Sequence, residues 1–137
     1  DALLRLLLIE LSVYGVKNDG DSLPVAICDY IRSHKGCVKV RDVAAHFEYN
    51  EDYITRVFKR IYDKGIKSYI DTVRLQLIRR WLADGTYAIP EIAEKMQFDD
   101  YAAFYSFFKY KTGMSPAAYR ALYVGHDGES KPGEKTV

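Results

Sequence analysis

The sequence predicts an all-α fold in which two helix-turn-helix subdomains are joined by a long linker helix, with about seven helices in all. Three observations lead to this prediction. Apolar residues recur at helical spacing, and no segment shows the alternation typical of a strand. Capping residues stand at regular points between the helical segments. A segment that starts at Asp42 also recurs about 50 residues later, from Glu91.

The repeat is carried by apolar positions and by a shared Phe-Lys step. The pair Val43-Ala44 corresponds to Ile92-Ala93, and Phe58-Lys59 corresponds to Phe108-Lys109. The second copy has gained one residue in the turn between its two helices. Two such units in one chain suggest a protein that binds duplex DNA through two recognition helices.

The first unit is expected to contain three helices. Asp21 or Ser22 caps a helix that runs to about Ser33, with these residues facing inward: Val25, Ile27, Cys28 and Ile31. A short helix follows over residues 40–47, and the turn lies at residues 48–49. Asn50 is a good N-cap for the next helix, residues 50–62, whose inward positions have helical spacing: Ile54, Val57, Phe58 and Ile61.

Capping and helix-ending residues also set the expected limits of the linker helix and of the helices in the second unit. The linker helix spans residues 67–83 and ends at Asp84-Gly85. Pro90 opens a short helix that runs to about Met96. Asp99 or Asp100 caps the second recognition helix, residues 100–110, which Gly113 stops. Ser115-Pro116 then opens a final helix through about Tyr123.

Both ends of the chain are expected to lie outside this domain. Residues 1–21 are interpreted as the end of an upstream region, with a last helix over residues 2–14, followed by a linker over residues 17–22. Residues 124–137 are polar and are expected to form a disordered tail. The domain itself is assigned to residues 22–123.

The charge is informative only in its distribution, because the formal net charge is +1. Between Tyr53 and Arg80 there are eight Lys or Arg residues against two acids, a local basic stripe that fits phosphate contact. A solvated helix face is the alternative explanation of that stripe.

Other functional classes find little support. Cys28 and Cys37 have no partners at metal-site spacing, which favours reduced thiols of a cytoplasmic protein. The three histidines, His34, His46 and His126, are scattered, and no catalytic constellation or phosphate loop is visible. We therefore expect no metal, no cofactor and no enzymatic activity. The apolar run near the start is too short and too charged to cross a bilayer.

The chain from about Ser22 to Tyr123 resembles the C-terminal DNA-binding domain of the AraC/XylS family of bacterial transcription regulators, and the second half of this segment is the more specific. The residues that carry the resemblance are Glu91-Ile92-Ala93, Phe98, Asp100, Phe104, Phe108-Lys109, Gly113, Ser115-Pro116 and Tyr119-Arg120. The first half supports it through Ala44, Tyr53, Arg56, Phe58-Lys59, Tyr69-Ile70 and Arg74-Leu75. Four positions depart from the family pattern: Lys39 replaces a capping Ser, Asp63 and Gln97 replace glycines, and Ser106 replaces an arginine.

The resemblance implies a double-stranded DNA operator as partner, RNA polymerase as a further partner, and an upstream effector or dimerisation domain outside this chain. It implies that helices 50–62 and 100–110 enter the major groove about 34 Å apart. The operator sequence, the effector and the choice between activation and repression are left open.

The outward faces of the two recognition helices give the expected contacts. Base-facing residues are Asp52, Thr55 and Arg56 in the first helix, and Tyr101, Ala102, Tyr105 and Ser106 in the second. Phosphate contacts are expected from Lys59, Arg60, Arg74, Lys109 and Lys111. Arginine can pair with guanine, whereas the second face offers thymine-methyl contacts and few hydrogen bonds. The first unit is therefore expected to carry most of the base readout.

Two alternatives remain at this point. The weak hydrogen-bonding capacity around Ser106 would also fit a degenerate helix-turn-helix module that binds a protein, or binds DNA only non-specifically. A repair-type reaction through Cys28 is a third possibility, although nothing near it in sequence would activate the thiol. Of the aromatic residues between Phe98 and Tyr110, the phenylalanines are assigned to the core, and Tyr101 and Tyr105 remain candidates for DNA contact.

Overall fold

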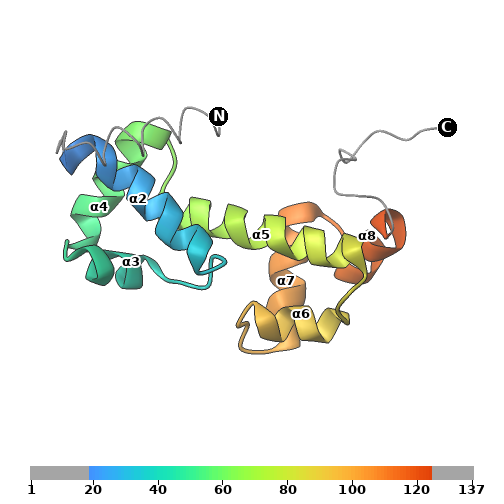
Figure 1. The fold of residues 1–137 in the computed structure, drawn as a ribbon. Helices are drawn as coiled ribbons and strands as arrows, with labels where there is room; N and C mark the ends of the chain where they lie inside the picture. The colour runs from blue at the N-terminus through green and yellow to red at the C-terminus, as the bar shows by residue number, and fades with distance from the viewer. Residues whose placement is uncertain (1–18, 125–137) are drawn as a thin grey trace. The chain divides into compact units, whose positions relative to one another are not determined.

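The computed structural model describes residues 19–124, and within them every regular element is an α-helix (Figure 1). The predicted all-α class is thus confirmed. The helices are α2 (Asp19–Ser33), α3 (Val40–Phe47), α4 (Glu51–Tyr62), α5 (Ile66–Asp84), α6 (Ile89–Lys95), α7 (Tyr101–Thr112) and α8 (Pro116–Tyr123). The predicted helix over residues 2–14 and the predicted tail lie outside the described residues. None of the described helices is long and apolar enough to cross a membrane.

The chain divides into two compact units, and the boundary falls between Val73 and Arg74, inside α5. The first part of α5 therefore belongs to unit 1 and the rest to unit 2. Unit 1 also contains α2, α3 and α4, whereas unit 2 contains α6, α7 and α8.

The core of unit 1 forms where α2 packs against α3 and α4. Its central side chains have no exposed surface, or almost none, and they come from all four helices: Ile27, Ile31, Val43, Ile54, Phe58, Ile66 and Ile70. Tyr53, Tyr62 and Tyr69 pack around this cluster. Burial of this apolar surface is the main favourable term that holds the unit together.

Unit 2 repeats the plan with different side chains. Its fully buried positions are Ile78, Leu82, Ile92, Met96, Phe104 and Phe108. Helix α7 contacts both α6 and α8. The ring of Phe108 lies edge-on to Tyr119 at 5.4 Å between centroids, and in unit 1 the ring of Phe58 lies 5.7 Å from Tyr69. The repeat therefore extends beyond the recognition helices, to the tyrosine of the helix that follows each of them.

Cap residues fix the limits of the helices as the sequence predicted. Asn50 Oδ1 accepts from the Tyr53 N–H at 3.0 Å, and Asp100 Oδ1 accepts from the Ala103 N–H at 2.7 Å. Ser115 Oγ does the same for α8 at 3.1 Å. At the N-terminus of α3, where the family pattern has a serine, the carboxylate of Asp42 instead accepts from the Lys39 backbone N–H at 2.9 Å. These bonds satisfy N–H groups that the helix itself leaves unpaired.

The two substituted glycine positions adopt the backbone conformation that glycine favours. Asp63 has φ 56° and Gln97 has φ 58°, both left-handed. Asp63 ends α4 in the same way that Gly113 ends α7. In each case the backbone N–H donates a hydrogen bond of 2.8 Å to the carbonyl four residues earlier. Left-handed backbone is costly for a side chain with a Cβ, and aspartate tolerates it better than glutamine does.

Two details of the sequence prediction are wrong. Helix α2 begins at Asp19, so part of the expected linker is helical. The acids of this stretch fall in a first helical turn, where negative charge is favourable. Ile61, predicted to face the core, is 46% exposed. Tyr62 covers Phe58 instead, at 4.8 Å between ring centroids. The position in unit 2 that corresponds to Ile61 is the exposed Lys111.

Phe58→Ala and Phe108→Ala should each lower the free energy of unfolding by about 3–5 kcal/mol, because each change leaves a cavity in a fully buried site. Thermal and denaturant unfolding of the two variants measure this. Unchanged stability in either variant would show that the two phenylalanines are not equivalent anchors.

Gln97→Gly should raise the stability by about 0.5–1 kcal/mol, since glycine removes the cost of a left-handed φ. Gln97→Ala is the matched control and should bring no gain, because alanine retains a Cβ. Equal unfolding midpoints for the glycine and alanine variants would contradict the account of this turn.

Candidate nucleic-acid interface

In unit 1, α3 and α4 are joined by a tight turn that sets the direction of α4. Glu48 takes up a left-handed conformation with φ 59°, and the Tyr49 N–H returns to the Ala44 carbonyl at 3.0 Å. The Asn50 cap then starts α4. A helix, a left-handed turn and a capped second helix form the helix-turn-helix arrangement that the sequence predicted.

Helix α4 has one buried face and one exposed face. Ile54, Val57 and Phe58 are buried, whereas Asp52 and Arg56 are exposed and Thr55 is half-buried. The Arg56 Nε donates to the Asp52 carbonyl at 3.4 Å, so this side chain runs back along its own helix toward the N-terminus. Arg56 is thus exposed beside Asp52 on the face that was predicted to meet the bases.

The exposed face continues toward the end of α4 with cations. Lys59 and Arg60 are both exposed in the last turns of the helix, as expected for phosphate contacts. Tyr49, which the sequence placed only in a turn, is 37% exposed and stacks on Tyr53 at 5.0 Å between centroids. Sequence reasoning missed this pair because the two tyrosines belong to different elements, a turn and a helix.

The second unit presents α7 in the same way but with different chemistry. Tyr101, Ala102 and Ser106 are exposed, and Tyr105 is half-buried. Their counterparts on α4 include Asp52 and Arg56, so the charged groups of α4 are replaced here by neutral ones. The exposed cations follow near the C-terminal end of α7: Lys109 and Lys111. The Lys109 ammonium lies 5.8 Å from the centroid of the Tyr105 ring.

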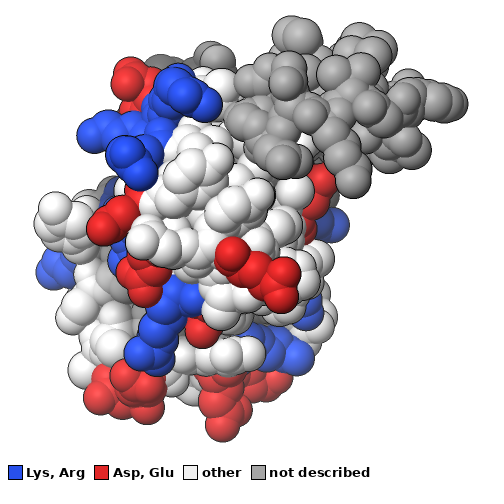
Figure 2. All heavy atoms as spheres, turned by 90° about the vertical axis from the view of Figure 1, so that its left-hand side faces the viewer, with Lys and Arg blue, Asp and Glu red and all other residues white. Residues whose placement is uncertain are grey.

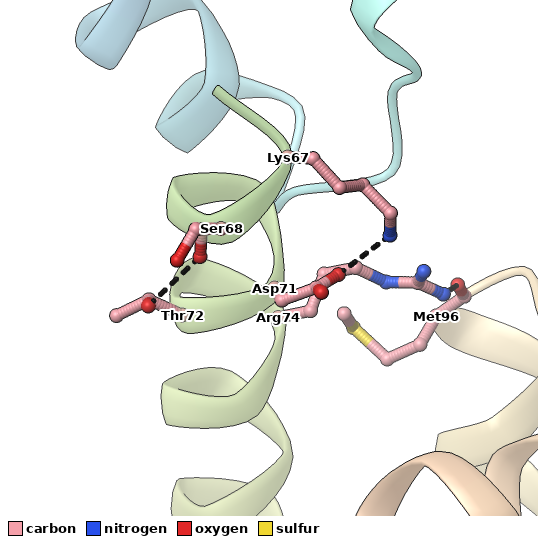
Figure 3. A network of polar contacts seen from close by, with 6 residues as sticks. All are labelled: Lys67, Ser68, Asp71, Thr72, Arg74 and Met96. Atoms are coloured by element: carbon pink, nitrogen blue, oxygen red, sulfur yellow. Dashed lines mark hydrogen bonds and ion pairs between the residues drawn. The ribbon is translucent and has the colours of Figure 1, made fainter. Parts of the chain in front are cut away.

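Arg74 has surroundings that the sequence did not predict. Its guanidinium donates to the Met96 carbonyl at 2.9 Å (Figure 3). The same group lies 4.2 Å from the centroid of the Phe98 ring. Met96 and Phe98 flank Gln97, the left-handed residue of the second turn. Figure 3 also shows Lys67 directed at Asp71 on the same helix, an ion pair at 2.8 Å between an exposed lysine and a mostly buried aspartate. Arg74 thus contacts both sides of the turn that precedes α7.

Arg120 ties α8 to the end of α5. Its guanidinium donates to the carbonyls of Leu82 at 3.2 Å and Trp81 at 3.4 Å, and also to that of Tyr87. The neighbouring Tyr119 is partly buried, and burial raises the pKa of its hydroxyl, an effect that Arg79 partly offsets. The Tyr-Arg pair that the resemblance singled out therefore has a structural role in unit 2.

Charge is mixed on the face of the molecule that Figure 2 draws. Figure 2 shows the side that lies on the left of Figure 1, where basic and acidic groups alternate without forming one continuous basic surface.

Within the described residues, no group of three or more His, Cys, Asp or Glu could hold a metal ion. Cys28 is 2% exposed, and its position inside the core of unit 1 leaves no approach for a substrate.

Comparison with known proteins identifies the domain type. A family model described as a helix-turn-helix domain matches residues 43–122. The melibiose operon regulatory protein of Escherichia coli is 36% identical over 83 residues, which cover 61% of this chain and 28% of that protein. The transcriptional regulatory protein HptR of Staphylococcus aureus is 32% identical over 119 residues, which cover 87% of this chain and 44% of HptR. The chain thus spans less than half of either relative.

Two solved structures share the fold. The C-terminal domain of AraT, a response regulator from Geobacillus stearothermophilus, superimposes with a TM-score of 0.70 at 20% identity, covering 82% of this chain and 94% of that one. The DNA-binding domain of AdpA, a global transcriptional factor solved with a target DNA, gives a TM-score of 0.66 at 25% identity, with coverages of 73% and 91%. Together with the matched family model, these findings show that the chain belongs to the AraC/XylS-type helix-turn-helix family of transcription regulators.

Proposed function

We propose that this domain binds double-stranded DNA in a sequence-specific manner, with α4 and α7 as recognition helices in the major groove. The observation that carries the proposal is the two-sided character of α4. Ile54, Val57 and Phe58 are buried, and the opposite face presents Asp52 and Arg56 to solvent. The major groove admits a helix, and a side chain on its outward face can reach base edges there.

Arg56 is the main reader in this proposal. A guanidinium can form two hydrogen bonds with guanine O6 and N7, whereas a carboxylate such as that of Asp52 accepts from cytosine N4. Thr55 adds a hydroxyl at the side of the same face. The matching face of α7 contains Ser106 in place of Arg56 and offers little hydrogen-bonding capacity. We therefore assign most of the hydrogen-bonded readout to α4.

Phosphate contacts are assigned to four exposed cations near the C-terminal ends of the recognition helices: Lys59, Arg60, Lys109 and Lys111. Such contacts position a protein on the duplex without reading its sequence. For Arg74, its bond to the Met96 carbonyl and its place over Phe98 favour a different role, in which it holds the turn before α7.

The relatives extend the proposal to the whole protein. The melibiose operon regulator and HptR are regulatory proteins by name, and AdpA was solved with its target DNA. We propose that this domain likewise serves a cytoplasmic transcription regulator. Its further partners would be RNA polymerase and an effector or dimerisation domain N-terminal to the residues described here.

A second candidate is a protein-interaction module with only non-specific DNA binding. The exposed alanines Ala102 and Ala103 favour it, because they place apolar surface where a second reader would be expected to have polar groups. The two candidates differ in sequence preference, which the following measurements test.

Affinity for duplex DNA should fall steeply with salt, with a log–log slope of several units, because cations of both units release counterions from phosphates. Titration of a duplex at several salt concentrations measures this slope. Lys59→Gln and Lys109→Gln should each reduce it by about one unit. A response that is flat in salt, or no duplex binding at low salt, would rule out the DNA-binding function and favour the interaction module.

Arg56→Ala should weaken binding to a specific site by about 1–3 kcal/mol and relax the preference at one base pair, expected to be a guanine. Ser106→Ala, at the corresponding position of α7, is the matched control and should change affinity much less. Both variants are compared on a selected site and on a scrambled one. If Ser106→Ala relaxed the specificity more, the roles of the two helices would be inverted.

Arg74→Met should lower the stability of the DNA-free protein by about 1–3 kcal/mol, since it removes a charged hydrogen bond and a contact with an aromatic ring. The salt slope of duplex binding should stay unchanged. Unaltered stability together with a slope reduced by about one unit would instead make Arg74 a phosphate contact.

A further inference from the structure

The outward face of α7 carries two tyrosine rings and exposed alanines around the hydroxyl of Ser106. An inference from this face rests on the proposed DNA binding. Tyr101 is 45% exposed, and its ring lies 6.5 Å from that of Tyr105. Ala102 is exposed beside them, one residue into the helix. The Tyr101 ring is also held at 6.0 Å from the buried Phe104. Two tyrosine rings and a methyl group thus share the surface that corresponds to the charged face of α4.

The outline of this surface indicates what covers it. Lys109 is exposed at one end, and its ammonium lies 5.8 Å from the centroid of the Tyr105 ring. At the other end, the carboxylate of Asp100 is engaged with the Ala103 N–H at 2.7 Å. A protein surface that sets a cation beside apolar side chains complements a partner surface on which phosphates lie beside apolar groups. In the major groove, the apolar group among the base edges is the C5-methyl of thymine.

We infer that α7 reads its part of the DNA site through thymine methyl groups, with Ala102 as the specificity-determining residue and Tyr101 and Tyr105 as the neighbouring contacts. Burial of a methyl group against a methyl or a ring is favourable by the hydrophobic effect, and cytosine, which lacks this methyl, gains nothing there. Recognition is then divided between hydrogen bonds at α4 and methyl contacts at α7. The chemical class recognised by α7 is a thymine-containing step, with no requirement for guanine.

Replacing thymine by deoxyuridine removes the methyl group and leaves every hydrogen-bonding group in place, which makes it the direct test. A specific duplex is first selected, and the subsite of α4 is located as the positions whose preference changes in Arg56→Ala. Each thymine of the duplex is then replaced singly by deoxyuridine, and the dissociation constant is measured with the full chain. At thymines in the subsite of α7, we expect each replacement to lower the affinity about fourfold. This is the effect of losing the burial of one group the size of a methylene.

Ala102→Gly tests the residue that makes the contact. In this variant, the loss caused by deoxyuridine should shrink to less than about twofold at one position. Ala117→Gly is the matched control, because Ala117 is also exposed, also follows the first residue of its helix, α8, and should suffer the same loss of helix propensity. The control should retain the full effect of deoxyuridine.

Two results would overturn the proposal. If no thymine outside the α4 subsite were sensitive to deoxyuridine while specific binding persisted, α7 would not read methyl groups, although the domain would still be a DNA reader. If the effect of deoxyuridine were the same in Ala102→Gly and in Ala117→Gly, Ala102 would not be the contacting residue. A complete lack of specific duplex binding would instead remove the proposed function itself, and this inference with it.

Discussion

The rest of the structure depends on the burial of one phenylalanine near the middle of each recognition helix. Phe58 and Phe108 have no exposed surface, and each packs against the tyrosine of the following helix, Tyr69 or Tyr119. Because the side of the helix that carries the phenylalanine packs in the core, the opposite side faces solvent. The hydrophobic anchor therefore decides which side chains are available to a partner, and the caps at Asn50 and Asp100 fix where the available face begins.

Helix α5 completes both cores with residues from its two parts. Ile66 and Ile70 enter the core of unit 1, and Ile78 and Leu82 are buried in unit 2. The same plan is thus built twice, and the sequences differ most where the helices face outward. The proposed division of labour, hydrogen bonds at α4 and methyl contacts at α7, follows from that difference.

Much of this fold could be predicted from the sequence, because helix periodicity, caps and the internal repeat are local or self-similar signals. The limits of α3 and the Asn50 cap follow from such signals. Ile61 was predicted wrongly because periodicity shows which side of a helix a residue lies on but not how far the neighbouring helices extend along it. The surroundings of Arg74 could not be predicted, since the carbonyl that it binds is 22 residues away and no local pattern marks it. The outward residues of α4 and α7 were identified by elimination, and their roles on DNA stay predictions.

In the proposed function, this domain reads sequence through the outward faces of α4 and α7. Selection of bound duplexes from a random pool, with the chain at a salt concentration that suppresses non-specific binding, is the decisive experiment. We expect a motif with two separate parts, of which one contains a guanine and the other is rich in thymine. A bound pool that stays random in sequence would contradict the proposed function and would leave a helical module without sequence readout.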